Sequence, residues 1–246
     1  MDVNNPGILI SRGLTKISIK NYSAAIEDFN QAIKLNSSIV DIYLYRAVAK
    51  AGLKDYESAI NDCNYAIGLN QFNNQAFVRR GLIKHEQEKF EEAIQDYNFA
   101  LKLKPDEAYT YYVRAIAKYR LEEFEGAMID YNKVIELNPY NALAYYNRAM
   151  LKIQIEKKDE AISDLAKVIE LSPLHVLSYY NHGILLGEQK KYLEALDDFN
   201  KAIELYPDFG EAYYMRSIAK KKTWTAEVCR TGLLYIKGND GSSKQT

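Results

Sequence analysis

The stretch Ala108–Asn141, AYTYYVRAIAKYRLEEFEGAMIDYNKVIELNPYN, decides the fold, because the chain restates it at a fixed step of 34 residues. In its first half, Tyr112, Ala115 and Tyr119 stand three and four residues apart, the spacing that gathers side chains on one helical face. Two glutamates interrupt the apolar pattern, which then restarts and stops before Pro139, a residue that ends helices. The stretch therefore predicts two amphipathic helices joined by a tight turn.

Fixed columns of residues recur through six complete copies of this unit. The second helix of every copy carries an alanine, at Ala25, Ala59, Ala93, Ala127, Ala161 and Ala195. Four residues later comes a larger side chain, at Phe29, Cys63, Tyr97, Tyr131, Leu165 and Phe199. Helices approach closely only where a small side chain faces a large one. The alternation therefore predicts that the copies stack on one another.

The repetition resembles that of the tetratricopeptide repeat (TPR) family, whose period is 34 residues. Tyr111, Ala115, Ala127, Tyr131 and Pro139 fill places in the family pattern. The resemblance covers residues 6–237 and implies an all-α fold, an α-solenoid with a right-handed superhelix of six to seven helix-turn-helix repeats. The copies span residues 6–39, 40–73, 74–107, 108–141, 142–175 and 176–209.

A degenerate seventh copy is expected at residues 210–237, followed by a disordered tail at 238–246. Cys229, Leu233 and Ile236 fall in packing columns, whereas Gly232 in mid-helix weakens the helix by about 1 kcal/mol relative to alanine. A separate capping helix over residues 224–237 is therefore predicted, with Trp224 covering the last core.

Composition excludes several classes of function. The net charge of −1 gives no global field for nucleic acid or an anionic membrane, and we expect neither nucleic-acid binding nor membrane insertion. Two cysteines cannot form a disulfide framework, and Cys63 falls in a core column.

Residues 7–19 fit a repeat helix and not a signal peptide. We expect a cytoplasmic chain, or a periplasmic or secreted one if the exposed apolar residues 8–10 follow a missing leader or repeat.

A basic column runs along the first helices, where the TPR pattern has leucine. It comprises Arg12, Arg46, Arg80, Arg114, Arg148, His182 and Arg216. Sixteen residues after each of the first six stands an acid, at Asp28, Asp62, Asp96, Asp130, Asp164 and Asp198. Such a column could hold an acidic ligand, but a carboxylate in step with every basic residue favours an ion-pair ladder joining first to second helices.

A groove is implied on the face that a TPR superhelix turns inward, where the family holds its ligands. The predicted partner-binding residues there are Tyr112, Tyr146, Tyr180, Tyr214, Asn147, Asn181, Ile116, Met150, Ile184, Tyr119 and His85. Tyrosine combines a large contact area with a polar tip, which suits a binding surface. Simple packing between adjacent first helices is the alternative for the same residues.

The segment Tyr146-Asn147-Arg148 is similar to the helix of co-chaperone TPR domains that clamp a carboxylate at a chain end. The clamp also requires a lysine and an asparagine on the preceding copy. Tyr112 and Ile116 stand at those places here, so no clamp is predicted.

No catalytic or nucleotide-binding motif occurs in the sequence, and the three histidines lack metal-ligand spacing. We therefore expect a non-enzymatic scaffold without cofactor or metal, whose partner is a protein or peptide of unknown identity. Three alternatives stay open: the targeting or regulatory arm of a larger protein or secretion complex, an RNA-binding helical repeat, and weak self-association through the ends of the stack. The RNA reading is weakened by the period, which in pentatricopeptide repeats is one residue longer.

Overall fold

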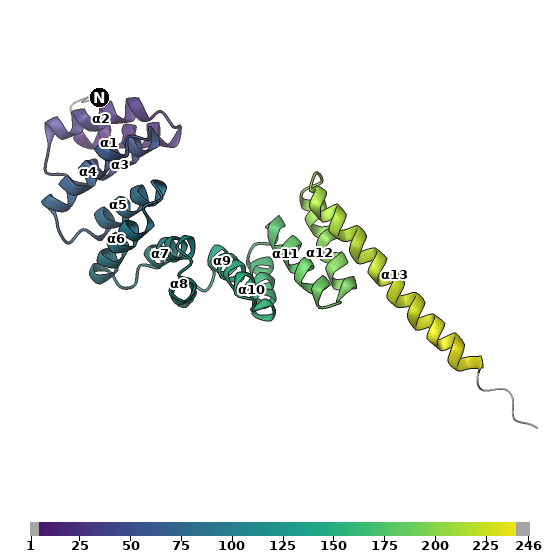
Figure 1. Ribbon diagram of the computed structural model, residues 1–246. Coiled ribbons are helices and arrows are strands. Elements are labelled where there is room, and N and C mark those ends of the chain that lie inside the picture. The colour runs from purple at the N-terminus through teal and green to yellow at the C-terminus, as the bar shows by residue number, and fades with distance from the viewer. Residues whose placement is uncertain (1–4, 240–246) are drawn as a thin grey trace, which may run out of the picture. The chain divides into compact units, whose positions relative to one another are not determined.

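The computed structural model describes residues 5–239, and the surroundings of side chains as far as residue 225. Within that range every regular element is a helix (Figure 1). The first helices of the copies are α1 (Pro6–Ser18), α3 (Val40–Gly52), α5 (Asn74–Glu86), α7 (Ala108–Arg120), α9 (Ala142–Gln154) and α11 (Val176–Glu188). Their second helices are α2 (Tyr22–Leu35), α4 (Tyr56–Leu69), α6 (Phe90–Leu103), α8 (Phe124–Leu137), α10 (Lys158–Leu171) and α12 (Tyr192–Leu205), and α13 (Gly210–Asn239) follows. The predicted all-α repeat solenoid is confirmed.

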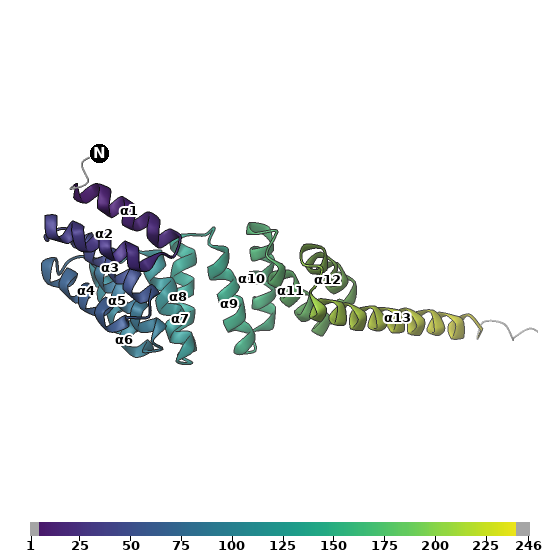
Figure 2. The same ribbon diagram turned by 90° about the horizontal axis from the view of Figure 1, so that it is seen from above.

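The helices form two compact units, Met1–Pro139 with α1–α8 and Tyr140–Thr246 with α9–α13. Inside each unit every helix packs against the next one along the chain (Figure 2). In the first unit α1 also meets α3, α3 meets α5, and α5 meets α7. The first helices of that unit therefore line one common surface. None of the helices in the described part is long and apolar enough to cross a membrane.

The same tight turn joins the two helices of every complete copy. One residue in each turn has a left-handed backbone, at Lys20, Lys54, Glu88, Glu122, Glu156 and Lys190, with φ between 59° and 64°. After α1, the N–H of Lys20 donates to the carbonyl of Ile17 at 2.9 Å and that of Asn21 to the carbonyl of Lys16 at 2.8 Å. These two bonds satisfy carbonyls at the helix end and reverse the chain.

The seventh copy differs from the prediction of a separate helix over 224–237. Residues 210–239 form the single helix α13, and Trp224 is 68% exposed instead of covering the last core. Thirty-four residues after the left-handed Lys190 stands Trp224 itself. A bulky ring is a poor occupant of a left-handed position, so the turn is disfavoured and the helix continues. The side chains of Cys229, Gly232, Leu233 and Ile236, and residues 240–246 of the predicted tail, lie outside the described part.

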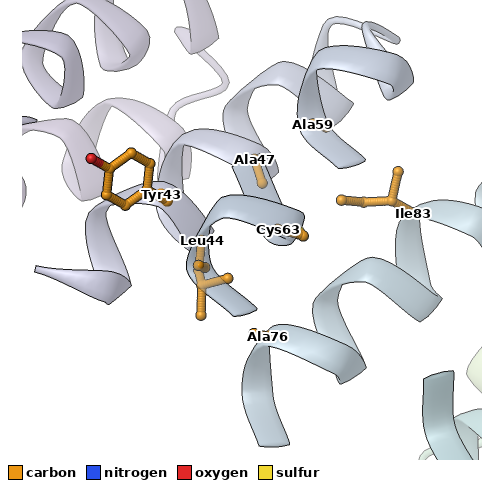
Figure 3. Close-up of a cluster of buried hydrophobic side chains, with 8 residues drawn as sticks. Tyr43, Leu44, Ala47, Ala59, Cys63, Ala76 and Ile83 are labelled. Atoms are coloured by element: carbon orange, nitrogen blue, oxygen red, sulfur yellow. The ribbon is translucent and has the colours of Figure 1, made fainter. Parts of the chain in front are cut away.

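The core consists of clusters formed where copies meet. One cluster lies among α3, α4 and α5 (Figure 3) and contains Tyr43, Leu44, Ala47, Ala59, Cys63, Ala66, Ala76 and Ile83. The six column alanines are completely buried, as the alternation of small and large residues predicts. Cys63 is buried in its predicted core column, and that burial raises the pKa of its thiol to about 12.

Candidate functional site

In the first five copies the ion-pair ladder joins the two helices through a cluster of one arginine, one lysine and one aspartate, whereas in the sixth His182 Nδ1 lies 2.7 Å from Asp198. In the fourth copy, Arg114 donates from Nε to Asp130 Oδ2 at 2.8 Å and from Nη2 to Oδ1 at 2.6 Å. Lys118 Nζ lies 2.9 Å from the same carboxylate, which is completely buried. The same two-pronged pairing joins Arg12 to Asp28, Arg46 to Asp62, Arg80 to Asp96 and Arg148 to Asp164. Every one of these aspartates is therefore neutralised inside the chain.

The arginines of the ladder also connect one copy to the next. Nη1 of Arg46 donates to Asn30 on the preceding copy at 2.7 Å, and the same bond joins Arg80 to Asn64 and Arg114 to Asn98. Their guanidinium groups lie over an aromatic ring three residues earlier, as Arg46 does over Tyr43 at 5.6 Å. The donors of Arg46, Arg80 and Arg114 are therefore occupied within the chain.

The column of predicted groove tyrosines packs partly against second helices. The ring of Tyr112 meets Tyr131 edge-on at 6.3 Å, and Tyr180 lies 6.2 Å from Phe199. Tyr214 differs, because it is 66% exposed. Tyr112 and Tyr180 thus stabilise their own copies while remaining partly open to solvent. Their contact with a partner stays a prediction.

Tyr146 and Asn181 tie the first helices α9 and α11 together. Asn181 Nδ2 donates to the Tyr146 hydroxyl at 3.2 Å and lies 3.7 Å from the sulfur of Met150. Burial raises the pKa of Tyr146, while its hydrogen bond to Asn181 acts in the opposite direction. Met150 and Ile184 pack on the edges of core clusters. Ile116 and Asn147 are half-buried.

The two other predicted groove residues are engaged by aromatic neighbours. The ring of Tyr119 lies 5.8 Å from that of Phe124, and His85 meets Phe90 edge-on at 5.0 Å. Burial, followed by the charge of Arg120, lowers the pKa of His85. Burial therefore favours the neutral form of His85. Among the described residues no group of three His, Cys, Asp or Glu side chains could hold a metal ion.

A pocket of about 320 Å³ opens between the first helices of the first unit. It is lined by Ile17, Tyr22, Val48, Ala51, Gly52, Arg79, Leu82, Ile83, Glu86 and Tyr109. Its lining is mixed: apolar side chains such as Val48 and Leu82 lie beside one cation, Arg79, and one anion, Glu86, from α5. The side chains of Arg79 and Glu86 form no ion pair or hydrogen bond with another residue of the described part. The pocket therefore contains two charged side chains that are not engaged within the described part.

None of these lining residues is among the predicted binding residues, because the prediction rests on residue types that recur at equivalent positions of the copies. Arg79 departs from its column, which reads Ser11, Tyr45, Arg79, Val113, Asn147, Asn181 and Met215. A charge found in one copy alone is a signal that could have identified the pocket. The predicted tyrosines lie in copies other than that of Arg79.

Family models agree with the repeat geometry. Models described as tetratricopeptide repeat or TPR repeat match residues 12–74, 81–122, 108–141, 130–163 and 176–209. The chain belongs to the tetratricopeptide repeat family. This TPR chain has no match among curated protein sequences.

Solved TPR structures share the fold. YrrB, titled a TPR protein with an unusual peptide-binding site, is 24% identical with a TM-score of 0.63, over 77% of this chain and 97% of its own. MamA is 22% identical with a TM-score of 0.62, over 67% and 96%. The C-terminal part of a TPR protein from Cytophaga hutchinsonii is 18% identical with a TM-score of 0.69, over 86% and 88%.

Proposed function

We propose that this TPR chain is a non-enzymatic scaffold that binds a peptide or helix of a partner protein on the surface lined by its first helices. Membership of the TPR family supports a protein-interaction scaffold. The observation that carries the finer proposal is the pocket between α1, α3, α5 and α7, because it combines apolar side chains with two opposite charges that no side chain of the described part pairs.

The chemistry of the pocket indicates the kind of segment that it holds. Ile17, Val48 and Leu82 offer apolar contact to one large side chain of the partner. Arg79 and Glu86 are seven residues apart on α5, which corresponds to about 10 Å along the helix axis. A ligand with an acidic residue on one side of its apolar anchor and a basic residue on the other would pair with both charges, and this pairing would fix its direction.

The packing of the copies on one another supports tight binding by the surface of the first helices. The side chains are held at regular intervals by packed helices, so little conformational freedom is lost on the scaffold side when a ligand binds. The titled peptide-binding site of YrrB, a protein of similar fold, is consistent with a peptide ligand here. Tyr146 and Tyr180 would supply a second contact surface in the other unit.

A peptide library displayed on phage and selected on the full chain tests this function. Selected peptides should share an apolar residue flanked by opposite charges. In fluorescence anisotropy, Arg79→Glu should weaken their binding about tenfold or more, because a favourable charge pair becomes a repulsive one. Lys102→Glu, the same change of charge at an exposed site on the second helix α6, should not.

Binding unaffected by Arg79→Glu would exclude the pocket as the site. The double variant Tyr146→Ala with Tyr180→Ala then tests the tyrosines separately, with far-UV circular dichroism to verify helicity. Retained binding in both variants would remove the proposal of a ligand on the first helices.

A further inference from the structure

Among the residues that the structure describes, α13 is a first helix with no second helix beside it. It packs against α12 and α11, as a first helix should, and then runs on past the end of α12 (Figure 1). In each of the six complete copies, by contrast, the first helix is covered by the second helix that follows it. The face of α13 that would receive such a helix is therefore open among the described side chains.

Exposure of matched residues shows which face is open. Tyr213 is 43% exposed, whereas Tyr43 and Phe77 at the same place in earlier copies are 5% and 6% exposed. Ser217 is exposed where Ala47, Ala115 and Ala149 are completely buried. Together, Tyr213, Tyr214, Arg216, Ser217, Lys220 and Trp224 make up what we call the open face.

The charges of the open face lack the partner that they have elsewhere. Arg216 and Lys220 recur at the places of Arg114 and Lys118, which share the buried carboxylate of Asp130. Arg216 retains its bond to Asn200, at 3.0 Å, and its position over the ring of Tyr213. No carboxylate among the side chains described through residue 225 pairs with Arg216 or Lys220.

We propose that the open face binds an amphipathic helix of a partner protein in the place of the missing second helix, with a carboxylate of that helix between Arg216 and Lys220. The six second helices of this chain define the pattern that fits: alanine, an aspartate three residues later, a large residue directly after it, and alanine or valine three residues further on. This inference does not depend on the pocket of the first unit.

The large residue of the partner helix should follow the copies whose first helix carries a Cβ at the place of Ser217, and these copies have Cys63, Tyr131 and Leu165. Phe29, Tyr97 and Phe199 each face a glycine, and a Cβ built on those glycines would come within 2.9 Å or less of the ring. Leu165 lies in the copy that has Ala149 at the glycine place. Ser217 carries a Cβ at this position, as Ala47, Ala115 and Ala149 do, and α10 is the matching second helix that contains no aromatic residue.

The chain's own later residues and a second molecule of this chain are two other possible occupants of the open face, and both match the charges of Arg216 and Lys220 poorly. The chain's own residues after Trp224 offer Gly232 at the step where the aspartates stand, so they would leave Arg216 and Lys220 uncompensated. In a second molecule of this chain, α1 has no acidic residue and carries Arg12 and Lys16, which would face like charges. A partner helix with an acidic residue remains the best match.

The test uses Trp224, which is the only tryptophan of the chain and lies on the open face. The full chain is titrated with a peptide of residues 156–173, EKKDEAISDLAKVIELSP, which contains no aromatic residue. We expect saturable binding with a shift of Trp224 emission to shorter wavelength, because the docked helix covers the indole. The peptide with Asp164→Asn should bind about tenfold more weakly, since it lacks the charge that pairs with the two cations.

Charge reversal separates this docking from unspecific association. The chain variant Arg216→Glu should lose the peptide, and a peptide with Asp164→Arg should recover binding to that variant. Lys222→Glu is the matched control, because it lies two residues beyond Lys220 on another side of the helix and should leave binding unchanged.

Three results would overturn the proposal: no emission change up to about 1 mM peptide, equal binding of the Asp164→Asn peptide, or a shift of emission with chain concentration alone. The last result would assign the open face to a second molecule of this chain. Loss of phage-selected peptides from the pocket would leave these measurements unaffected, so the two proposals fail separately.

Discussion

At the scale of single residues, the close approach of α5 and α6 depends on the absence of one carbon atom. A Cβ built on Gly81 would lie 2.6 Å from the ring of Tyr97, which is completely buried. At Gly68 on α4 a Cβ meets nothing within 4 Å. Packing against Tyr97 therefore requires glycine at position 81, whereas no neighbouring atom requires it at position 68, although both residues lie in helices.

Gly81→Ala should lower the free energy of unfolding by about 1–3 kcal/mol, because the added carbon overpacks a filled contact. Gly68→Ala should raise it by about 0.5–1 kcal/mol, since alanine is the better helix former and has free space there. Urea unfolding followed by circular dichroism measures both. Equal effects of the two substitutions would contradict the packing argument.

The carboxylate of Asp28 links stability to pH. Its burial raises its pKa, but the hydrogen bonds and charges of Arg12 and Lys16 outweigh burial, so the pKa lies below its ordinary value. The folded chain then binds this proton less readily than the unfolded chain does. The stabilisation is present above the ordinary pKa of about 4 and is lost as the pH falls through the lowered value.

We therefore expect the urea midpoint of the native chain to fall more steeply than that of Asp28→Asn as the pH drops from 6 to 3. The asparagine variant should be less stable at pH 6, and the difference should shrink in acid. A constant difference between the two proteins across this range would contradict the assignment.

At the scale of elements, the ladder holds each pair of helices in register more than it adds net stability. Asp130 is completely buried between Arg114 and Lys118, and a carboxylate left there without its partner is strongly unfavourable. Apolar residues of similar volume at all three places avoid that penalty as well as the original desolvation. Removal of one member and replacement of all three should therefore have different consequences.

Arg114→Met should destabilise the chain by about 3 kcal/mol, because it leaves part of a buried charge uncompensated. Replacing the whole cluster, with Arg114→Met, Lys118→Met and Asp130→Leu, should restore most of that loss. Chemical unfolding of the two variants beside the native chain provides the comparison. A triple variant less stable than the single one would show that the ion pairs themselves supply the stability.

The helices and turns could be predicted because 34-residue spacing is written redundantly in every copy. The seventh copy could not, since its outcome depends on Trp224 at a left-handed backbone position that only the observed turns reveal. The pocket escaped prediction for a related reason. Residues that recur in every copy do not reveal a feature that is present in one copy alone. Arg79 and Glu86 line the pocket in one copy, and no side chain on the neighbouring helices pairs with them.

At the scale of the whole molecule, stability is local, as expected for a chain in which each copy touches only its neighbours. The pocket belongs to the unit Met1–Pro139 and the open face to the unit Tyr140–Thr246. Two ligands of different chemistry would thus occupy different parts of one chain. A partner that carries both recognition segments would gain affinity through linkage, provided that its linker spans the two sites.

The repetition of a pair of one basic and one acidic residue in every complete copy affects how the chain folds. Because every complete first helix carries a basic residue and every second helix an acid at matching places, pairings one whole copy out of register satisfy nearly the same charges. The three-residue connection between α1 and α2 favours the correct mate by its high effective concentration, and each later pair has an equally short link. Synthesis order would reinforce this choice, since each acidic helix emerges directly after its basic counterpart.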